Sequence, residues 1–354
     1  MVLAVVSGIM ETRKTIFANI FPDAPAFRWR QFEQGLFDAN QGSFETMTAL
    51  AKDMRESLSK AMPFLSVKEV AVLRSYNGDT EKAVLELSDG ARIETVLMRN
   101  ARGYRTICVS SQVGCAMACT FCATGKMGFG RNLTGDEIID QYRFWAYRLA
   151  VLQNEKERVS NIVFMGMGEP LANYDHVKSS IRTILAHTDI GVTKITVSTV
   201  GLVPMLEQIL HDATWPPVRL AISLHSANVK LRQEMMPTSY PEFLQKLSAW
   251  TKNYFQKFPE ARRHLTLEYI LLEGVNDGEE SALELARFAN GIGKVKVNLI
   301  PYNTTASAYR KSDEDHVTHF QEILQERGVD VTRRRAMGDD IAAACGQLII
   351  EKRG

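Results

Sequence analysis

The chain has 354 residues, of which 45% are hydrophobic and 23% are charged, as in ordinary folded globular proteins. This composition excludes a long disordered chain, and the net charge of +1 excludes a strong overall field that attracts nucleic acid. No stretch approaches the roughly 20 apolar residues of a membrane span. The short apolar start, Met1–Met10, lacks a basic lead, so we do not expect a signal peptide. Five cysteines are too few for a secreted disulfide framework, which favours the reducing cytoplasm.

The first 95 residues differ from the rest of the chain. Apolar positions in Phe27–Leu58 recur at helical spacing, which predicts helices. Val67–Val96 alternates around Asn77-Gly78 and Asp89-Gly90, which indicates a small β-meander with tight turns. We therefore predict an N-terminal accessory domain over residues 1–95 and a core over residues 96–354.

In the core, short β-type runs alternate with longer helical stretches such as Thr134–Gln153, Tyr174–Ala186 and Asp277–Ala289. This alternation predicts an α/β fold with a parallel sheet, in the form of a partial (β/α)6 barrel. Val329–Arg333 is a candidate for one further strand. The six predicted strands are Thr106–Val109, Asn161–Met165, Lys194–Val197, Arg219–Leu224, Thr266–Leu271 and Val295–Ile300.

Three cysteines in the spacing C-x3-C-x2-C, Cys115, Cys119 and Cys122, follow the first predicted strand. The C-terminal ends of parallel strands are where such folds gather their ligands. Four thiolates would close a four-iron cluster, whereas three leave one iron open to a substrate or cofactor. The spacing therefore predicts a reactive iron–sulfur site.

Zinc and simple core packing are the alternatives for these cysteines. Structural zinc takes four ligands, often in paired C-x2-C knuckles, but no second knuckle exists and the nearest histidine is His176. Cys108 would be a fourth ligand at an unusual spacing. Free cysteines also pack well in cores, yet Gly114 and Thr120 beside the motif are not typical of a core strand.

Polar residues follow the later strands as well. Gly168-Glu169-Pro170 comes after the second strand, and glycine lets the backbone approach a ligand closely. Taken singly, each of these residues would be a turn or cap residue. The others are Ser198 after the third strand, Ser223-Leu224-His225 after the fourth and Asn303 after the sixth.

The cysteine motif and its place after the first strand resemble the radical S-adenosylmethionine (SAM) superfamily. The resemblance implies a 4Fe–4S cluster held by Cys115, Cys119 and Cys122, whose open iron binds SAM. It implies that Glu169 accepts a hydrogen bond from the SAM amino group. The other SAM contacts that it implies are Gly168, Ser198, Ser223, Leu224, His225 and Asn303.

A narrower resemblance adds the two remaining cysteines. Cys108–Cys115, Gly274–Asp277 and Gly338–Leu348 with Cys345 resemble the RlmN-type adenine-C2 methyltransferases of 23S rRNA and tRNA, in the RlmN/Cfr family. The match runs from about Glu94 to Leu348.

This resemblance implies a role for each residue. Cys345 takes a methyl group from one SAM, and a second SAM yields the radical that activates it. Cys108 resolves the intermediate through a transient disulfide with Cys345, and Glu94 accepts the C2 proton, with Glu86 and Asp89 as more distant alternatives. The resemblance also suggests reduced flavodoxin as electron donor, and nothing in the sequence argues against a monomer.

Two other functions stay open. A Cfr-type enzyme would methylate C8 with the same five cysteines, although Gly168-Glu169-Pro170 is more similar to the C2 enzymes. A noncatalytic iron–sulfur or zinc RNA-binding module is the alternative of another class. Candidate phosphate contacts are Arg262-Arg263, Lys294 with Lys296, and Arg333-Arg334-Arg335, each of which would otherwise be a solvated face. The N-terminal domain is a candidate for holding RNA, from which the target adenine has to leave its stack.

Overall fold

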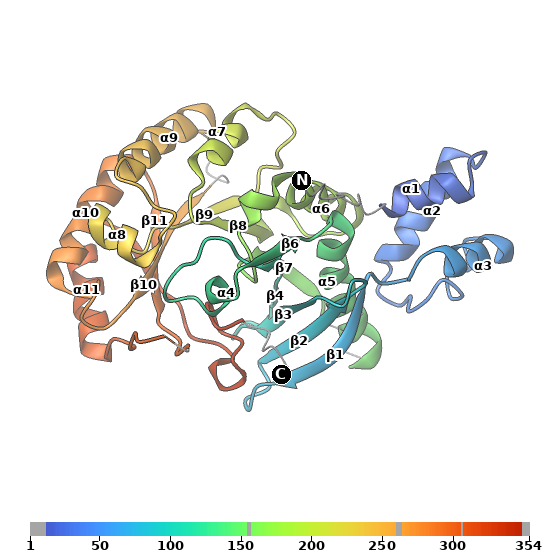
Figure 1. Ribbon diagram of the computed structural model, residues 1–354, viewed down its shortest axis with the longest axis horizontal. Helices are drawn as coiled ribbons and strands as arrows, with labels where there is room; N and C mark the ends of the chain where they lie inside the picture. The colour runs from blue at the N-terminus through green and yellow to red at the C-terminus, as the bar shows by residue number, and fades with distance from the viewer. Residues whose placement is uncertain (1–11, 154–156, 260–263, 306, 349–354) are drawn as a thin grey trace, which may run out of the picture.

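The computed structural model describes residues 12–153, 157–259, 264–305 and 307–348 (Figure 1). A ten-stranded sheet forms its centre, antiparallel from β1 to β4 and parallel from β4 through β12. The predicted α/β fold with a partial barrel is confirmed, and the candidate further strand is β12. In spatial order the strands are β1 (Val67–Arg74), β2 (Thr80–Leu87), β3 (Arg92–Arg99), β4 (Arg105–Cys108), β7 (Val159–Phe164), β8 (Ile195–Thr199), β9 (Arg219–Ser223), β10 (Leu265–Leu271), β11 (Lys296–Pro301) and β12 (Asp330–Arg333).

Helices cover the outside of the parallel strands, and three more stand apart at the N-terminal end (Figure 1). Helix α5 begins at a reciprocal capping box, in which Thr134 and Glu137 each accept from the other's backbone amide. No helix in the described ranges has the length and apolarity to cross a membrane. The helices are α1 (Arg13–Ile20), α2 (Ala26–Phe37), α3 (Lys52–Ala61), α4 (Ala123–Lys126), α5 (Gly135–Tyr147), α6 (Tyr174–His187), α7 (Val203–His211), α8 (Val229–Met235), α9 (Phe243–Lys257), α10 (Glu279–Ile292) and α11 (Glu314–Glu326).

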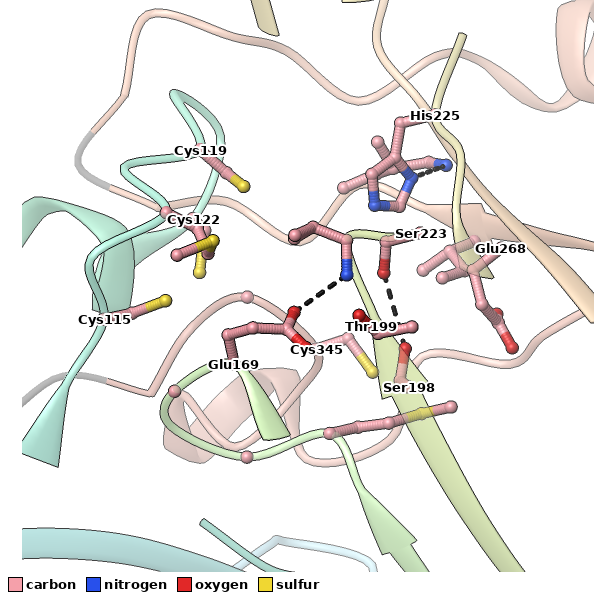
Figure 2. A pocket seen from close by; sticks show the side chains of 18 of the residues that line it. Cys115, Cys119, Cys122, Glu169, Ser198, Thr199, Ser223, His225, Glu268 and Cys345 are labelled. Carbon is pink, nitrogen blue, oxygen red and sulfur yellow. Dashed lines mark hydrogen bonds between the residues drawn. The ribbon is translucent and has the colours of Figure 1, made fainter. Parts of the chain in front are cut away.

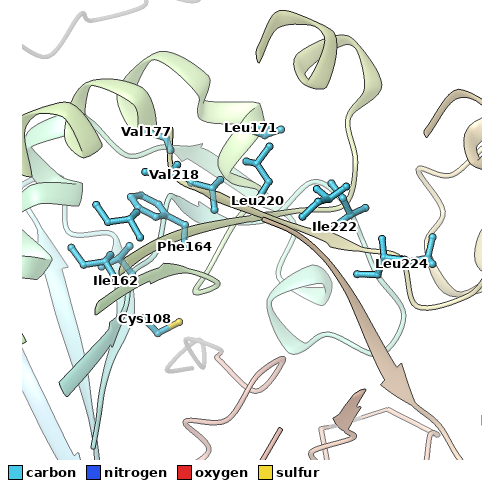
Figure 3. Close-up of a cluster of buried hydrophobic side chains, with 14 of the residues drawn as sticks. Cys108, Ile162, Phe164, Leu171, Val177, Val218, Leu220, Ile222 and Leu224 are labelled. Carbon is cyan, nitrogen blue, oxygen red and sulfur yellow. The ribbon is translucent and has the colours of Figure 1, made fainter. Parts of the chain in front are cut away.

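Alternation along the strands separates a helix-facing core from the barrel interior. Ile162, Phe164, Leu220 and Ile222 are at most 1% exposed and pack with residues of the covering helices such as Val177 (Figure 3). Successive side chains of a strand point to opposite faces, so the residues between them turn inward. The polar strand residues therefore face the barrel interior, where a ligand can reach them.

The residues of the predicted accessory domain belong to two different parts of the structure, the main sheet and a separate group of helices. Strands β1–β3 continue the main sheet through the antiparallel pairing of β3 with β4, so the predicted boundary at residue 95 falls inside a strand. Helices α1–α3 and the segment after them bury a separate small core that includes Phe17, Phe32 and Leu58. That residues 1–95 form a unit of their own stays a prediction.

A buried carboxylate joins these helices to the barrel. Asp140 on α5 forms ion pairs with Arg13 and Arg143, and Oδ2 also accepts from the Ser66 amide at 2.6 Å. Burial opposes ionisation of Asp140, but the two guanidinium groups lower its pKa to about 2. This pKa lies below the ordinary 3.8, so the stabilisation is present above pH 3.8 and is lost as pH falls through about 2.

Replacing Asp140 should therefore weaken the whole fold. Asp140→Asn removes an anionic partner of the buried Arg143 and leaves Arg13 with the longer contact to Asp136 at 3.6 Å, and we expect the free energy of unfolding to fall by about 3–5 kcal/mol. Chemical denaturation at neutral pH measures it. The control is Asp175→Asn, whose side chain is 87% exposed and pairs only weakly with Lys178. Equal stability of the two variants would contradict the role assigned to Asp140.

Candidate active site

The three motif cysteines stand on a loop that closes back on itself. It is framed by the paired strands β5 (Gln112–Gly114) and β6 (Phe129–Asn132), with α4 between them. Gly114 has a φ of +72°, and a Cβ there would lie 1.9 Å from the Gly128 oxygen. Only glycine fits at this crossing. The crossing turns the loop so that the three thiols face one cavity, as Figure 2 shows.

The chemistry of these thiols fits a bound iron–sulfur cluster. Burial raises the pKa of Cys115 to about 11, and it raises the pKa of Cys119 and Cys122 as well. A cationic cluster would compensate the thiolate charges that burial disfavours. Within the described residues no three His, Cys, Asp or Glu side chains are arranged to hold a single metal ion. The spread of the thiols suits a cluster, in which each thiolate takes its own iron.

Glu169 is the buried acid of the same cavity. Gly168 before it has a φ of +99°, and a Cβ there would lie 2.5 Å from the Gln112 side chain. The Glu169 carboxylate accepts from the Leu171 and Val200 amides at 2.9 and 2.8 Å (Figure 2). Burial still raises its pKa to about 7, and no basic side chain of the described ranges pairs with it. The cavity thus presents a carboxylate suited to the ammonium group of a ligand.

Several other predicted residues line this cavity of about 840 Å³, which opens to solvent. Ser198 and Ser223 come from neighbouring strands, with hydroxyls 3.4 Å apart. His225 also lines the wall, but its Nδ1 accepts from the Ile270 amide at 3.1 Å. Burial lowers the His225 pKa to about 3, so the ring is neutral.

Two predicted SAM contacts are placed elsewhere. Leu224 is fully buried in the core, and its amide donates to the Glu268 carbonyl. Asn303 follows β11 but lines a second cavity, where its amide donates to the Cys345 carbonyl at 3.2 Å. That these two residues contact SAM stays a prediction, for which their positions give no support.

Cys345 stands on a C-terminal segment that returns to the cysteine loop. The Ala123 amide donates to the Gly346 oxygen at 2.8 Å, and the Thr124 hydroxyl donates to the Leu348 oxygen at 2.6 Å. Cys345 is exposed and lines both cavities. Cys108 lines the second cavity, and burial raises its pKa to about 12. The sheet and the returning segment thus place the two remaining cysteines at one cavity.

The register of β3 against β4 decides where Glu94 lies. Val96 pairs with Cys108, so Glu94, two residues earlier, shares the sheet face of Cys108. Its side chain is 3% exposed and forms an ion pair with Lys82 at 2.9 Å. Asp89 instead pairs with Arg131, and Glu86 pairs with Arg92.

Comparison with known proteins agrees with this geometry. Residues 109–286 match the model of the radical SAM superfamily. The ribosomal RNA large subunit methyltransferase N of Nitrosopumilus maritimus is 42% identical, over 84% of this chain and 85% of the relative. The dual-specificity RNA methyltransferase RlmN of Psychrobacter arcticus is 38% identical over 95% of this chain and 84% of the relative. This chain belongs to the RlmN family of radical SAM RNA methyltransferases.

A solved structure extends the RlmN-family likeness to the fold. The crystal structure of a radical SAM methyltransferase from Sphaerobacter thermophilus matches with a TM-score of 0.86 and 35% identity. The match covers 96% of this chain and 97% of that chain, so it includes the N-terminal helices as well as the barrel.

Sequence reasoning identified Ser223 but missed the rest of a polar row inside the barrel of this RlmN-family enzyme. Ser223, Glu268, Asn298 and Thr332 occupy one register across β9 to β12. Asn298 donates to Glu268 at 3.1 Å, and Thr332 donates to Asn298 at 2.5 Å. A single polar residue at an inward position of an apolar strand, such as Glu268 in Leu265–Leu271, is the signal that could have found it.

The basic run Arg333-Arg334-Arg335 divides in the structure. Arg333 pairs with Glu314 on α11, whereas Arg334 turns into the site and donates to Glu268 at 2.9 Å. Arg334 also lines both cavities together with Cys345.

The other predicted phosphate contacts are placed less centrally. Lys296 lies near Asp330 at 3.8 Å, and Lys294 is exposed. Arg262 and Arg263 fall outside the described residues. RNA contacts by these groups stay predictions.

SAM affinity should depend on pH through Glu169. The ligand-free carboxylate with a pKa near 7 is mostly protonated at about pH 6 and mostly ionised at about pH 8. Only the ionised form pairs with an ammonium group, so we expect SAM to bind about tenfold more tightly at the higher pH. Calorimetry on the cluster-loaded enzyme measures this.

Glu169→Gln should flatten that pH dependence, while the exposed control Glu279→Gln should keep it. A SAM affinity that falls as pH rises toward 8 would contradict the assignment of Glu169 to SAM.

The raised pKa of Glu169 also affects the stability of the ligand-free fold. Because the pKa in the folded state lies above the ordinary 4.5, the free energy of unfolding falls as pH rises from 4.5 through about 7.

Arg334 should govern the reactivity of Cys345. We expect Arg334→Gln to slow alkylation of Cys345 by iodoacetamide several-fold at neutral pH, because the guanidinium group that shares both cavities with this thiol is lost. Mass spectrometry of the Cys345 peptide measures the rate. Arg335→Gln, a change at the exposed neighbouring residue, is the matched control, and equal rates in the two variants would contradict the role.

Proposed function

We propose that this enzyme methylates C2 of an adenine in 23S rRNA, and in tRNA next to the anticodon. One observation carries the proposal: Cys345 lines the cavity of the motif cysteines and also the cavity that contains Cys108. A thiol at that position can meet a methyl donor on one side and a nucleobase and a resolving thiol on the other. The RNA substrates follow the dual-specificity RlmN relative.

The need for a thiol follows from the target atom. C2 lies between two ring nitrogens and is electron-poor, so it does not attack the methyl group of SAM. The Cys345 sulfur, which lines the same cavity as the motif cysteines, makes that attack as a thiolate instead, and S-methylcysteine forms as the sulfonium bond to the methyl group breaks. When bound, a 4Fe–4S cluster and a second SAM supply a 5′-deoxyadenosyl radical, which removes a hydrogen atom from the S-methyl group. Two SAM molecules are thus used per turnover.

Cys345, Glu94 and Cys108 then act in order. The methylene radical on Cys345 adds to C2. The adduct then loses its C2 proton, for which Glu94 is the proposed acceptor, and one electron, which the oxidised 4Fe–4S cluster would take up. The Cys108 sulfur attacks the Cys345 sulfur. The carbon–sulfur bond breaks with its electron pair going to the methylene carbon, which gains a proton to become a methyl group. A Cys108–Cys345 disulfide remains and is reduced before the next turnover.

The ligands and partners follow from the same proposal. Cys115, Cys119 and Cys122 hold one cluster per chain, and Glu169, Ser198 and Ser223 contact SAM. The enzyme works as a cytoplasmic monomer with an electron donor such as flavodoxin. The C8 alternative uses the same five cysteines and differs only in the carbon that is methylated.

Nucleoside analysis tests the target atom. We expect 2-methyladenosine in rRNA and tRNA from cells that express the enzyme, and its absence from cells without it. 8-Methyladenosine without 2-methyladenosine would replace the proposal with the C8 reaction.

Cysteine variants test the chemistry. Cys345→Ala should abolish methyl transfer, because the methyl acceptor is lost. Cys108→Ala should form S-methylcysteine but retain RNA on the protein, because the resolving thiol is lost. Intact mass spectrometry and denaturing gels detect both. Full RNA methylation by Cys345→Ala would contradict the proposal, because the methyl group would then not pass through Cys345.

A further inference from the structure

A buried cation stands beside the proposed proton acceptor. Lys82 on β2 pairs with Val96 in the sheet register, so its side chain shares the face of Glu94 and Cys108. Its Nζ lies 2.9 Å from Glu94 Oε1, and the two side chains are only 7% and 3% exposed. A pair this dry interacts strongly and is screened little by salt.

The same ammonium group touches the segment that carries Cys345. Lys82 Nζ donates to the Ala342 carbonyl at 3.1 Å, three residues before the proposed methyl acceptor. Ala342 has a φ of 50° and a ψ of 43°, a left-handed conformation that is unfavourable for a non-glycine residue. The hydrogen bond from Lys82 to the Ala342 carbonyl therefore stabilises an unfavourable backbone conformation.

Two further contacts dock this segment on the hairpin of β1 and β2. The Tyr76 amide donates to Asp340 Oδ2 at 2.7 Å. Gly338 packs so closely on Thr80 that a Cβ would lie 2.6 Å from the Thr80 methyl carbon. Strands β1 and β2 thus form the surface on which the Cys345 segment packs, and Lys82 lies buried within this contact.

We propose that Lys82 is a positioning residue that keeps Glu94 ionised as a base and holds the Cys345 segment in a fixed position relative to Glu94. The inference rests on the proposed function and deepens it. A buried carboxylate that loses a cationic partner shifts toward its protonated form, and a protonated carboxyl group is too weak a base to take the C2 proton. Lys82 touches neither the nucleobase nor the sulfur, so it acts through Glu94 and Ala342.

The step under its control is one proton transfer. The C2–H bond of the adduct breaks, its electron pair stays in the adenine ring, and the proton passes to a Glu94 carboxylate oxygen. The Lys82 ammonium group balances the charge of the Glu94 carboxylate before the transfer. Methylation of Cys345 by the first SAM precedes this step and needs no base at Glu94.

The test separates the two steps in the cluster-loaded enzyme with SAM, reductant and an rRNA hairpin. We expect Lys82→Met to form S-methylcysteine at Cys345 and to slow release of methylated RNA by about tenfold or more, so that RNA stays covalently bound. Lys82→Arg should restore most of the release, because the charge returns. Hydrogen exchange in residues 338–348 should be faster in Lys82→Met than in the wild type.

Controls make each outcome decisive. Lys68→Met, a change at an exposed position of β1, should behave as the wild type. Glu94→Gln should retain RNA as Lys82→Met does, and the double variant should be no worse than Glu94→Gln alone. Because the double variant removes both charges of the Lys82–Glu94 pair, it guards against a failure to fold.

The results that overturn the inference differ from those that overturn the proposed function. Release of methylated RNA at the wild-type rate by Lys82→Met would overturn the inference. Loss of S-methylcysteine in that variant would also overturn it, because Lys82 would then serve only the fold of the segment. If the wild type itself forms neither S-methylcysteine nor 2-methyladenosine, the proposed function fails instead.

Discussion

The active site depends on two hydrogen bonds between the cysteine loop and the C-terminal segment. They run from the Ala123 amide to the Gly346 oxygen and from the Thr124 hydroxyl to the Leu348 oxygen, the second across 224 residues of sequence. Bringing together segments so far apart in sequence costs chain entropy, and the packing of the barrel already offsets that cost. Without these bonds the Cys345 segment would keep its contacts to the β1–β2 hairpin but lose those to the cysteine loop. With them Cys345 lines both cavities.

Burial sets the charge states of the groups around that wall. The thiols of Cys115 and Cys108 and the carboxyl of Glu169 all have raised pKa values, because the cavity disfavours their negative forms. His225 is neutral for the same reason, since burial lowers its pKa to about 3. An interior that suppresses anions is a good receptor for ligands that bring positive charge. A cationic cluster and the ammonium of SAM are such ligands, so binding and ionisation proceed together.

Local patterns predicted the parts of the molecule that are themselves local. The alternation of strands and helices predicted the barrel, and the spacing of Cys115, Cys119 and Cys122 predicted the loop that faces the cavity. Partnerships between distant segments were not predictable in this way. Arg334 belonged to a basic run that suggested phosphate contacts. Only the fold turns it toward Glu268, because the direction of a side chain at a strand end depends on the strands beside it.

The β-meander of β1–β3 likewise shows that local sequence patterns do not predict how distant segments pair. Its sequence alternates around two tight turns, and nothing local says which strand pairs with β3, so it was assigned to an accessory domain. Pairing with β4 brings Val96 opposite Cys108 and thereby fixes Glu94 on the catalytic face. The turn from Asn100 to Tyr104 lies outside this register, and Gly103 there has a φ of +82°. A residue gained or lost in that turn changes the spacing between Glu94 and Cys108 in sequence but not in space, because the ladder of β3 and β4 sets their distance.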